Sequence, residues 1–193
     1  MRRILTLLTL FVLMVVAAGP TVAQAPPAKS PAKPAKPPKP AEESLQAWNA
    51  MAKKIIEMAE DFPEDKYDYR PTPEVRSFAQ IILHIGAVNY FFTNAAAGRE
   101  AGKAEDDPPR ANFKTKAYIV AYITKSFADG AAVIQQKGER GMAQHVKHPF
   151  GNRQASLNGV CRDLVEHSAE HYGNLVVYYR LNALVPPASR PRR

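Results

Sequence analysis

The chain has 193 residues, of which 46% are hydrophobic and 23% are charged, and its formal net charge is +8. The positive charge lies in the two tails, because residues 41–189 contain 17 basic and 18 acidic residues, a net charge of −1. A nucleic-acid-binding domain carries a basic patch on its folded surface, so this distribution excludes a nucleic acid as partner.

Residues 1–23 have the pattern of a signal peptide. Arg2 and Arg3 give a positive start, and residues 4–18 contain only apolar residues and threonines. Small residues follow, and we expect cleavage after Ala23. The apolar stretch has 15 residues, whereas a membrane span needs about 20. The sequence therefore predicts an exported protein, periplasmic or secreted, which contacts a membrane only if this segment stays uncleaved.

Residues 24–43 form a predicted linker. Residues 26–40 contain seven prolines and four lysines, a composition that gives an extended, semi-rigid spacer. The lysines leave contact with an anionic membrane surface open, but a tether without such contact is favoured. The single cysteine, Cys161, allows no intramolecular disulfide. One folded domain is expected at residues 44–187, stable through its core alone, followed by a basic tail at residues 188–193.

Apolar residues that recur at steps of three and four predict four amphipathic helices. The first spans residues 44–62, with Ser44 as its N-cap. A segment rich in proline and other turn formers follows. The second begins at Ser77, which forms a capping box with Gln80. It ends near Gly98, a residue suited to the left-handed cap position.

The third helix is predicted at residues 115–136, with a weak point at Gly130 and a C-terminal cap at Gly138. Residues 139–155 are predicted as a long loop. The fourth helix spans residues 156–184. One face of it carries an apolar stripe that includes two histidines: Leu157, Val160, Leu164, His167, His171, Leu175 and Tyr178.

The fold class that follows is all-α, a four-helix bundle with long connections between its helices. The three connections have about fifteen residues each, more than bundle neighbours usually need. Long connections permit crossovers, so the sequence leaves the order of the helices in the bundle open.

His84, His167 and His171 are the candidate metal ligands. His167 and His171 are four residues apart, so they lie on one helical face with Cβ atoms about 5–6 Å apart. His84 lies on the inner half of the second helix and reaches the other two if the second and fourth helices are neighbours. An interior histidine is more often a hydrogen-bonded core residue, but three of them favour a catalytic-type site with an open metal position.

Several other residues have side chains that suit a functional role. His145 and His148 in the long loop suit an exposed metal site, but a solvated loop is favoured. Cys161 is expected in the core, and Glu166 and Glu170 on a solvated face. Asn89 and Tyr90 are candidates for substrate contact, although aromatic packing explains Tyr90 equally well.

At these residues the chain resembles the DinB-like (DinB/YfiT-like) superfamily of metalloenzymes. The likeness covers most of residues 44–187. It rests on three segments: residues 69–78 (YRPTPEVRSF), residues 82–85 (ILHI), and residues 166–175 (EHSAEHYGNL) with residues 179–182 (YRLN). The resemblance implies a four-helix bundle in which His84, His167 and His171 hold a divalent metal ion, with zinc or nickel as the usual metal.

The resemblance fixes the site better than the reaction. Characterised relatives include thiol-dependent transferases and isomerases, but small thiols are mainly cytoplasmic, and the predicted export argues against a thiol substrate here. We therefore expect a metal-dependent transferase or hydrolase acting on an unknown small molecule, with no catalytic side chain assigned beyond the ligands. The alternative is a metal-binding or interaction bundle without catalysis, and a homodimer stays open.

Overall fold

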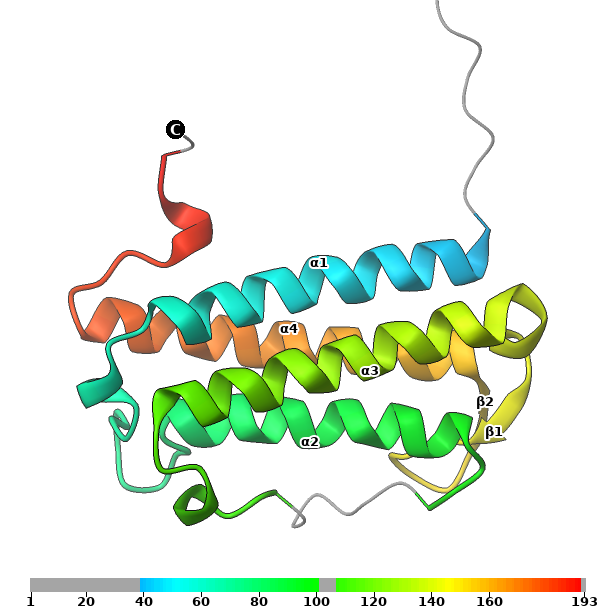
Figure 1. Ribbon diagram of the computed structural model, residues 1–193, viewed down its shortest axis with the longest axis horizontal. Coiled ribbons are helices and arrows are strands. Elements are labelled where there is room, and N and C mark those ends of the chain that lie inside the picture. The colour runs from blue at the N-terminus through cyan, green and yellow to red at the C-terminus, as the bar shows by residue number, and fades with distance from the viewer. Residues whose placement is uncertain (1–38, 101–106, 192–193) are drawn as a thin grey trace, which may run out of the picture. The chain divides into compact units, whose positions relative to one another are not determined.

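The computed structural model describes residues 39–100 and 107–191 (Figure 1). The predicted signal peptide and most of the predicted linker, residues 1–38, lie outside the described residues. Four long helices make up the described part: α1 (Pro40–Asp61), α2 (Phe78–Ala96), α3 (Lys116–Met142) and α4 (Leu157–Leu181). Three short 3-10 turns lie in the connections and the C-terminal segment: η1 (Glu64–Lys66), η2 (Arg110–Asn112) and η3 (Pro187–Ser189).

The four helices form a bundle in which sequence neighbours are not neighbours in space. α1 packs against α3 and α4, and α2 packs against the same two helices, so α1 and α2 lie diagonally opposite (Figure 1). α2 and α3 run in the same direction. The connection between them therefore begins at one end of the bundle and ends at the other. The predicted all-α bundle with long connections is confirmed, and its helix order is not a simple up-and-down one.

Trp48 of α1 is buried in the core, with 1% of its surface exposed. Its indole Nε1 donates to the carbonyl oxygen of Phe127 at 2.9 Å, and its ring contacts Phe92 and Phe127. Gly130 of α3 lies against the same ring, where any side chain would overlap it. Glycine is therefore required for the close approach of α1 and α3. The weak point predicted at Gly130 does not interrupt the helix, which kinks instead at Gly138, whose φ is 54°.

A second aromatic cluster closes one end of the bundle. Phe62 stacks on Phe78 with ring centroids 3.9 Å apart, and Tyr67 and Tyr179 pack around this pair. The Tyr179 hydroxyl donates to the Met58 carbonyl oxygen at 2.8 Å, and the Tyr67 hydroxyl to that of Ala59. These contacts join the end of α1, the start of α2 and the end of α4, and so fix the relative position of α2 and α4.

Two of the predicted helix caps have the expected structure, and a third does not. The capping box at Ser77 is confirmed: the Gln80 N–H donates to Ser77 Oγ at 3.3 Å, and the Ser77 N–H to Gln80 Oε1 at 2.8 Å. Gly98 has the expected left-handed conformation, with φ of 68°. The first helix begins at Pro40, ahead of the predicted Ser44, because proline suits the first helical position. Ser44 instead donates from its hydroxyl to Asn158 of α4.

The predicted loop 139–155 contains a short hairpin. Strands β1 (His145–Lys147) and β2 (Gln154–Ser156) pair antiparallel, with His145 opposite Ser156. The Leu157 N–H donates to the Gln144 carbonyl oxygen at 2.9 Å, which joins the hairpin to the start of α4. Strands of three residues are too short to show an alternating pattern, and this explains why the sequence predicted a loop.

Among the described helices, α3 has the length and apolar composition that could cross a membrane. A core helix of a bundle shares both properties, and α3 here packs against α1 and α2.

Candidate metal centre

The three predicted histidines meet in the structure. His84 comes from α2, and His167 and His171 come from the neighbouring helix α4. The Nε2 atom of His84 lies 3.2 Å from Nε2 of His167, which lies 3.2 Å from Nε2 of His171. One ligand atom from each residue falls within 4.8 Å of the others. His84 is 5% exposed, and the other two are half-buried.

This geometry fits a single divalent ion. Zinc binds imidazole nitrogen at about 2.0–2.1 Å in tetrahedral sites, which places two ligand nitrogens about 3.3 Å apart. The observed nitrogen separations of 3.2 Å agree with this spacing. In the described part of the chain, no other group of three or more histidine, cysteine or acidic side chains is close enough to hold an ion. Three protein ligands leave one tetrahedral position free, as in catalytic sites.

Asp107, which sequence reasoning missed, orients His84. Its Oδ1 lies 2.7 Å from Nδ1 of His84, and its Oδ2 accepts from Nε of Arg76 at 3.3 Å. Burial raises the pKa of Asp107, but the hydrogen bond with His84 and the charge and hydrogen bond of Arg76 outweigh it, so the net pKa is lowered. An ionised carboxylate only accepts hydrogen bonds. Nδ1 of His84 therefore carries the proton, and Nε2 points a lone pair at the cluster.

The other two histidines are held neutral by their surroundings. Burial, followed by the positive charges that His167 and His84 would carry, lowers the pKa of His171 to about 4. Burial and His84 likewise lower the pKa of His167. Both imidazoles are therefore unprotonated at neutral pH, which is the form that binds a metal. Nδ1 of His171 is buried and has no hydrogen-bond partner among the described residues.

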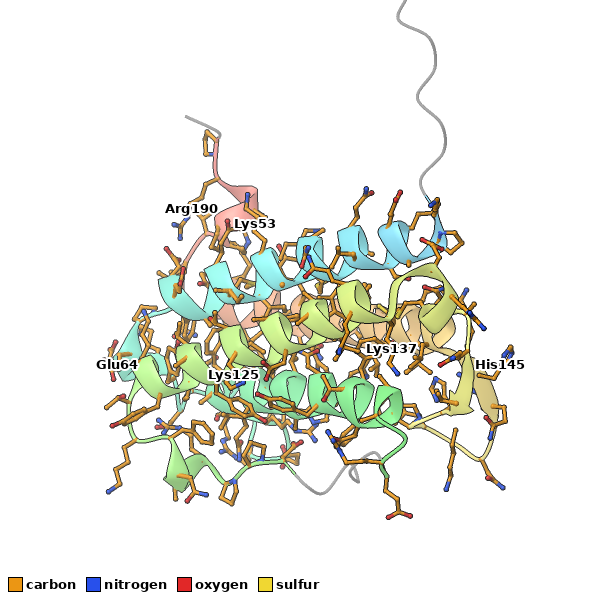
Figure 2. The ribbon with its side chains drawn as sticks, turned by 45° about the vertical axis from the view of Figure 1, so that its right-hand side comes forward. Lys53, Glu64, Lys125, Lys137, His145 and Arg190 are labelled. Atoms are coloured by element: carbon orange, nitrogen blue, oxygen red, sulfur yellow. The ribbon has the colours of Figure 1, made fainter. Side chains whose placement is uncertain are left out.

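The hairpin loop covers one side of the cluster. The Phe150 ring lies 5.7 Å from that of His167 and 5.9 Å from that of Phe91. His148 holds this loop in place: the Phe150 N–H donates to its Nδ1 at 2.9 Å, and its Nε2 donates to Asp163 at 3.2 Å. The solvated-loop interpretation is wrong for His148, which is 2% exposed. It is correct for His145, which lies on the outside of the hairpin (Figure 2).

The remaining candidates lie away from the cluster or face solvent. Cys161 is fully buried in the core, as predicted, and burial raises its pKa to about 12. Glu166 and Glu170 are exposed, as predicted. Asn89 is buried and donates to Ser126 Oγ at 3.0 Å, so it is a core residue. Tyr90 packs against the Tyr122 ring at 5.9 Å, which supports the aromatic-packing alternative.

A pocket of about 350 Å³ opens beside His171. The segment before α2 forms one wall, and one face of α4 forms the other. The lining residues are Pro71, Glu74, Val75, Arg76, Ile81, His171, Asn174 and Tyr178. Of the three histidines of the cluster, His171 lines this pocket.

Fold and site together define a class of protein: an all-α bundle whose adjacent second and fourth helices carry a cluster of three histidines. The chain belongs to the DinB superfamily, whose family model matches residues 47–175. The resemblance seen in the sequence is therefore confirmed.

Solved structures share the fold. A DinB-like protein from Bacillus cereus ATCC 10987 matches with a TM-score of 0.63 and 16% identity, over 76% of this chain and 95% of that chain. YjoA from Bacillus subtilis matches with a TM-score of 0.59 and 22% identity, over 78% of this chain and 99% of that chain. The sequence of YjoA, an uncharacterized protein of strain 168, is 24% identical over 126 residues, which is 64% of this chain and 79% of YjoA.

YfiT from Bacillus subtilis matches with a TM-score of 0.60 and 12% identity, over 79% of this chain and 94% of that chain. It is described as a probable metal-dependent hydrolase with an unusual four-helix bundle topology. At these identities the likeness shows the fold, and the description applies to YfiT.

Proposed function

We propose that this protein is a metal-dependent hydrolase or transferase whose divalent ion is held by His84, His167 and His171. The observation that carries the proposal is the convergence of three Nε2 atoms, at successive separations of 3.2 Å, from two separate helices. The description of YfiT as a probable metal-dependent hydrolase supports the hydrolytic reading. Zinc or nickel is the proposed ion, since imidazole ligands suit both.

An ion bound to three neutral imidazoles supplies Lewis acidity and lowers the pKa of a coordinated water to about 7. The residues of the chain prepare the site for this chemistry. Asp107 fixes the tautomer of His84, and burial keeps His167 and His171 unprotonated. The Phe150 ring packs against the ring of His167, and the pocket beside His171 has room for a small molecule.

The alternative is a bundle that holds metal without catalysis. The two functions differ in what removal of one ligand does. In an enzyme, His84→Ala loses metal and activity while the helices persist. If the metal is structural, the same change unfolds the chain, because binding energy is then folding energy. The extensive core around Trp48 and Phe62 favours a fold that persists without the ion.

Elemental analysis of protein purified without a histidine tag tests the metal site. We expect about one equivalent of zinc or nickel per chain, and loss of the metal in His84→Ala, His167→Ala and His171→Ala with helical circular dichroism retained. His145→Ala, an exposed histidine on the hairpin, is the control and should keep the metal. Sub-stoichiometric metal in repeated preparations of the wild type would refute the proposal. Hydrolysis of a panel of small esters and amides by loaded and metal-free protein separates catalysis from storage.

We also propose that the chain is exported and that cleavage after Ala23 leaves the bundle with the proline- and lysine-rich linker at its N-terminus. The support is the basic start, the apolar stretch and the small residues that follow. Cell fractionation and N-terminal sequencing of the native protein test this proposal. A cytoplasmic protein that retains its first residues would contradict it.

A further inference from the structure

We infer that the pocket beside His171 binds a small carboxylate-bearing substrate and that Arg76 receives the carboxylate. This inference rests on the proposed function and adds a substrate class to it. Arg76 acts here as a specificity-determining residue, because it contacts the part of the substrate that does not react.

The pocket lies against α4, beside the metal centre. Its lining residues on α4 are His171, Asn174 and Tyr178, which share one helical face, so a molecule in the pocket lies along the face that carries a proposed metal ligand. A volume of about 350 Å³ lies at the lower end of the range of about 300–1,000 Å³ that is typical of ligand sites. The apolar lining residues Pro71, Val75 and Ile81 suit a small organic body.

Tyr178 and Asp107 hold Arg76 in place. The Tyr178 hydroxyl donates to the Arg76 carbonyl oxygen, which fixes the backbone of Arg76 against α4. Asp107 Oδ2 accepts from Nε at 3.3 Å and lies 3.2 Å from Nη2. A guanidinium has five N–H donors, so these contacts leave three for a ligand. The side chain is 43% exposed, and Arg76 lines the pocket.

The charges around the pocket favour an anionic ligand. One carboxylate, Asp107, links Arg76 to His84, so the guanidinium lies one carboxylate away from the cluster. The charges of Asp107 and Arg76 cancel, and three neutral imidazoles leave the charge of a divalent ion uncompensated. Glu74, an exposed acidic residue on the pocket rim, offsets only part of it. The site therefore attracts an anion.

The donor set favours a carboxylate over a phosphate. The free edge of one guanidinium matches the two oxygens of a carboxylate, and Asn174 is an additional amide in the same pocket. A phosphate dianion usually collects several donors and positive charges, whereas this pocket provides one arginine and places Glu74 beside it. A monoanionic, planar group fits this donor set best.

Calorimetric titration with benzoate, in parallel with inorganic phosphate, tests the inference on zinc-loaded protein. A hydrogen bond to a charged group contributes about 1.5–3 kcal/mol, so Arg76→Gln should weaken benzoate binding by about 10- to 100-fold. Arg76→Lys keeps the charge beside Asp107 but loses the planar edge, and should also weaken binding. The control Arg99→Gln removes an exposed arginine beyond the end of α2, where it bonds Asn94, and should leave benzoate binding unchanged.

Zinc content is measured in every sample, which separates this inference from the proposed function. A wild type that holds no zinc would refute the proposed function. Zinc at full occupancy with no benzoate binding, or with equal affinity in Arg76→Gln and the wild type, would refute the carboxylate site alone. Tighter binding of phosphate than of benzoate would refute the substrate class. If Arg76→Gln loses zinc, Arg76→Lys replaces it in the comparison. Equal benzoate affinity in Arg76→Lys and the wild type would then refute the carboxylate site.

Discussion

At the scale of single residues, the chemistry of the cluster depends on which nitrogen of each imidazole carries a proton. His84 is fixed by Asp107, whose carboxylate accepts a hydrogen bond from Nδ1–H at 2.7 Å. His171 has no such partner among the described residues, and its pKa is lowered by burial, followed by the positive charges that His167 and His84 would carry. The same site thus prepares its ligands in two physical ways, which different substitutions can separate.

We predict that Asp107→Ala weakens metal binding by about 10- to 100-fold, because the loss of an outer partner leaves the orientation and tautomer of the ligand unfixed. Asp107→Asn, whose amide oxygen can still accept a hydrogen bond from Nδ1–H, should lie between this variant and the wild type. Competition against a chelating zinc indicator measures the affinities. The control is Asp68→Asn, an acidic residue paired with Arg110 on the surface. Equal zinc affinity in Asp107→Ala and the wild type would contradict the role of Asp107.

The lowered pKa of His171 predicts a pH dependence of the metal-free protein. The unfolded state has the ordinary histidine pKa of 6.5, whereas the folded state has a pKa of about 4. The unfolded chain therefore takes up a proton first, and stability is full above pH 6.5 and falls as the pH drops towards 4. Urea unfolding of chelator-treated protein should show this decline, and His171→Gln should show less of it. The same pH profile in both proteins would contradict the assignment.

At the scale of helices, one glycine determines how closely α1 and α3 approach. The Trp48 ring fills the space that a side chain on Gly130 would need. We predict that Gly130→Ala destabilises the fold by about 1–3 kcal/mol through overpacking, measured by urea unfolding. Gly173→Ala on α4 is the matched control, since nothing lies near its added carbon. It should stabilise the protein by about 0.5–1 kcal/mol, because alanine suits a helix interior better than glycine. A neutral effect of both changes would rule out this explanation of the α1–α3 contact.

The helices were predictable because each buries one face, which leaves a period in the sequence that long elements repeat several times. The His167–His171 pair follows from the same period. Asp107 was not predictable, since a loop residue reaches His84 only through the three-dimensional path of the connection. The hairpin was also missed, because pairing over three residues leaves no pattern. The burial of His148 depends on Phe150 and Asp163, contacts that no local signal encodes.

At the scale of the whole bundle, the cluster joins distant parts of the sequence. His84 and His167 are 83 positions apart and come from helices that the metal would link directly. An ion that binds only the folded state stabilises it by about 2.7 kcal/mol at one hundred times its Kd. For a domain of this size we expect a rise in the melting temperature of about 5–10 °C.

Differential scanning calorimetry with and without zinc measures this rise. His84→Ala should melt at the same temperature with and without zinc, and His145→Ala should respond like the wild type. If zinc does not change the melting temperature of the wild type, the folded chain binds the ion no more tightly than the unfolded chain does.

The position of the last two ligands has a consequence for the order of events in the cell. His167 and His171 lie on α4, so a ribosome must have passed position 171 before the cluster can assemble. Unfolded chains rarely offer a preformed site, and the choice among divalent ions depends on their availability. If the chain is exported unfolded, as a signal peptide allows, its ion is drawn from the ions present on the far side of the membrane.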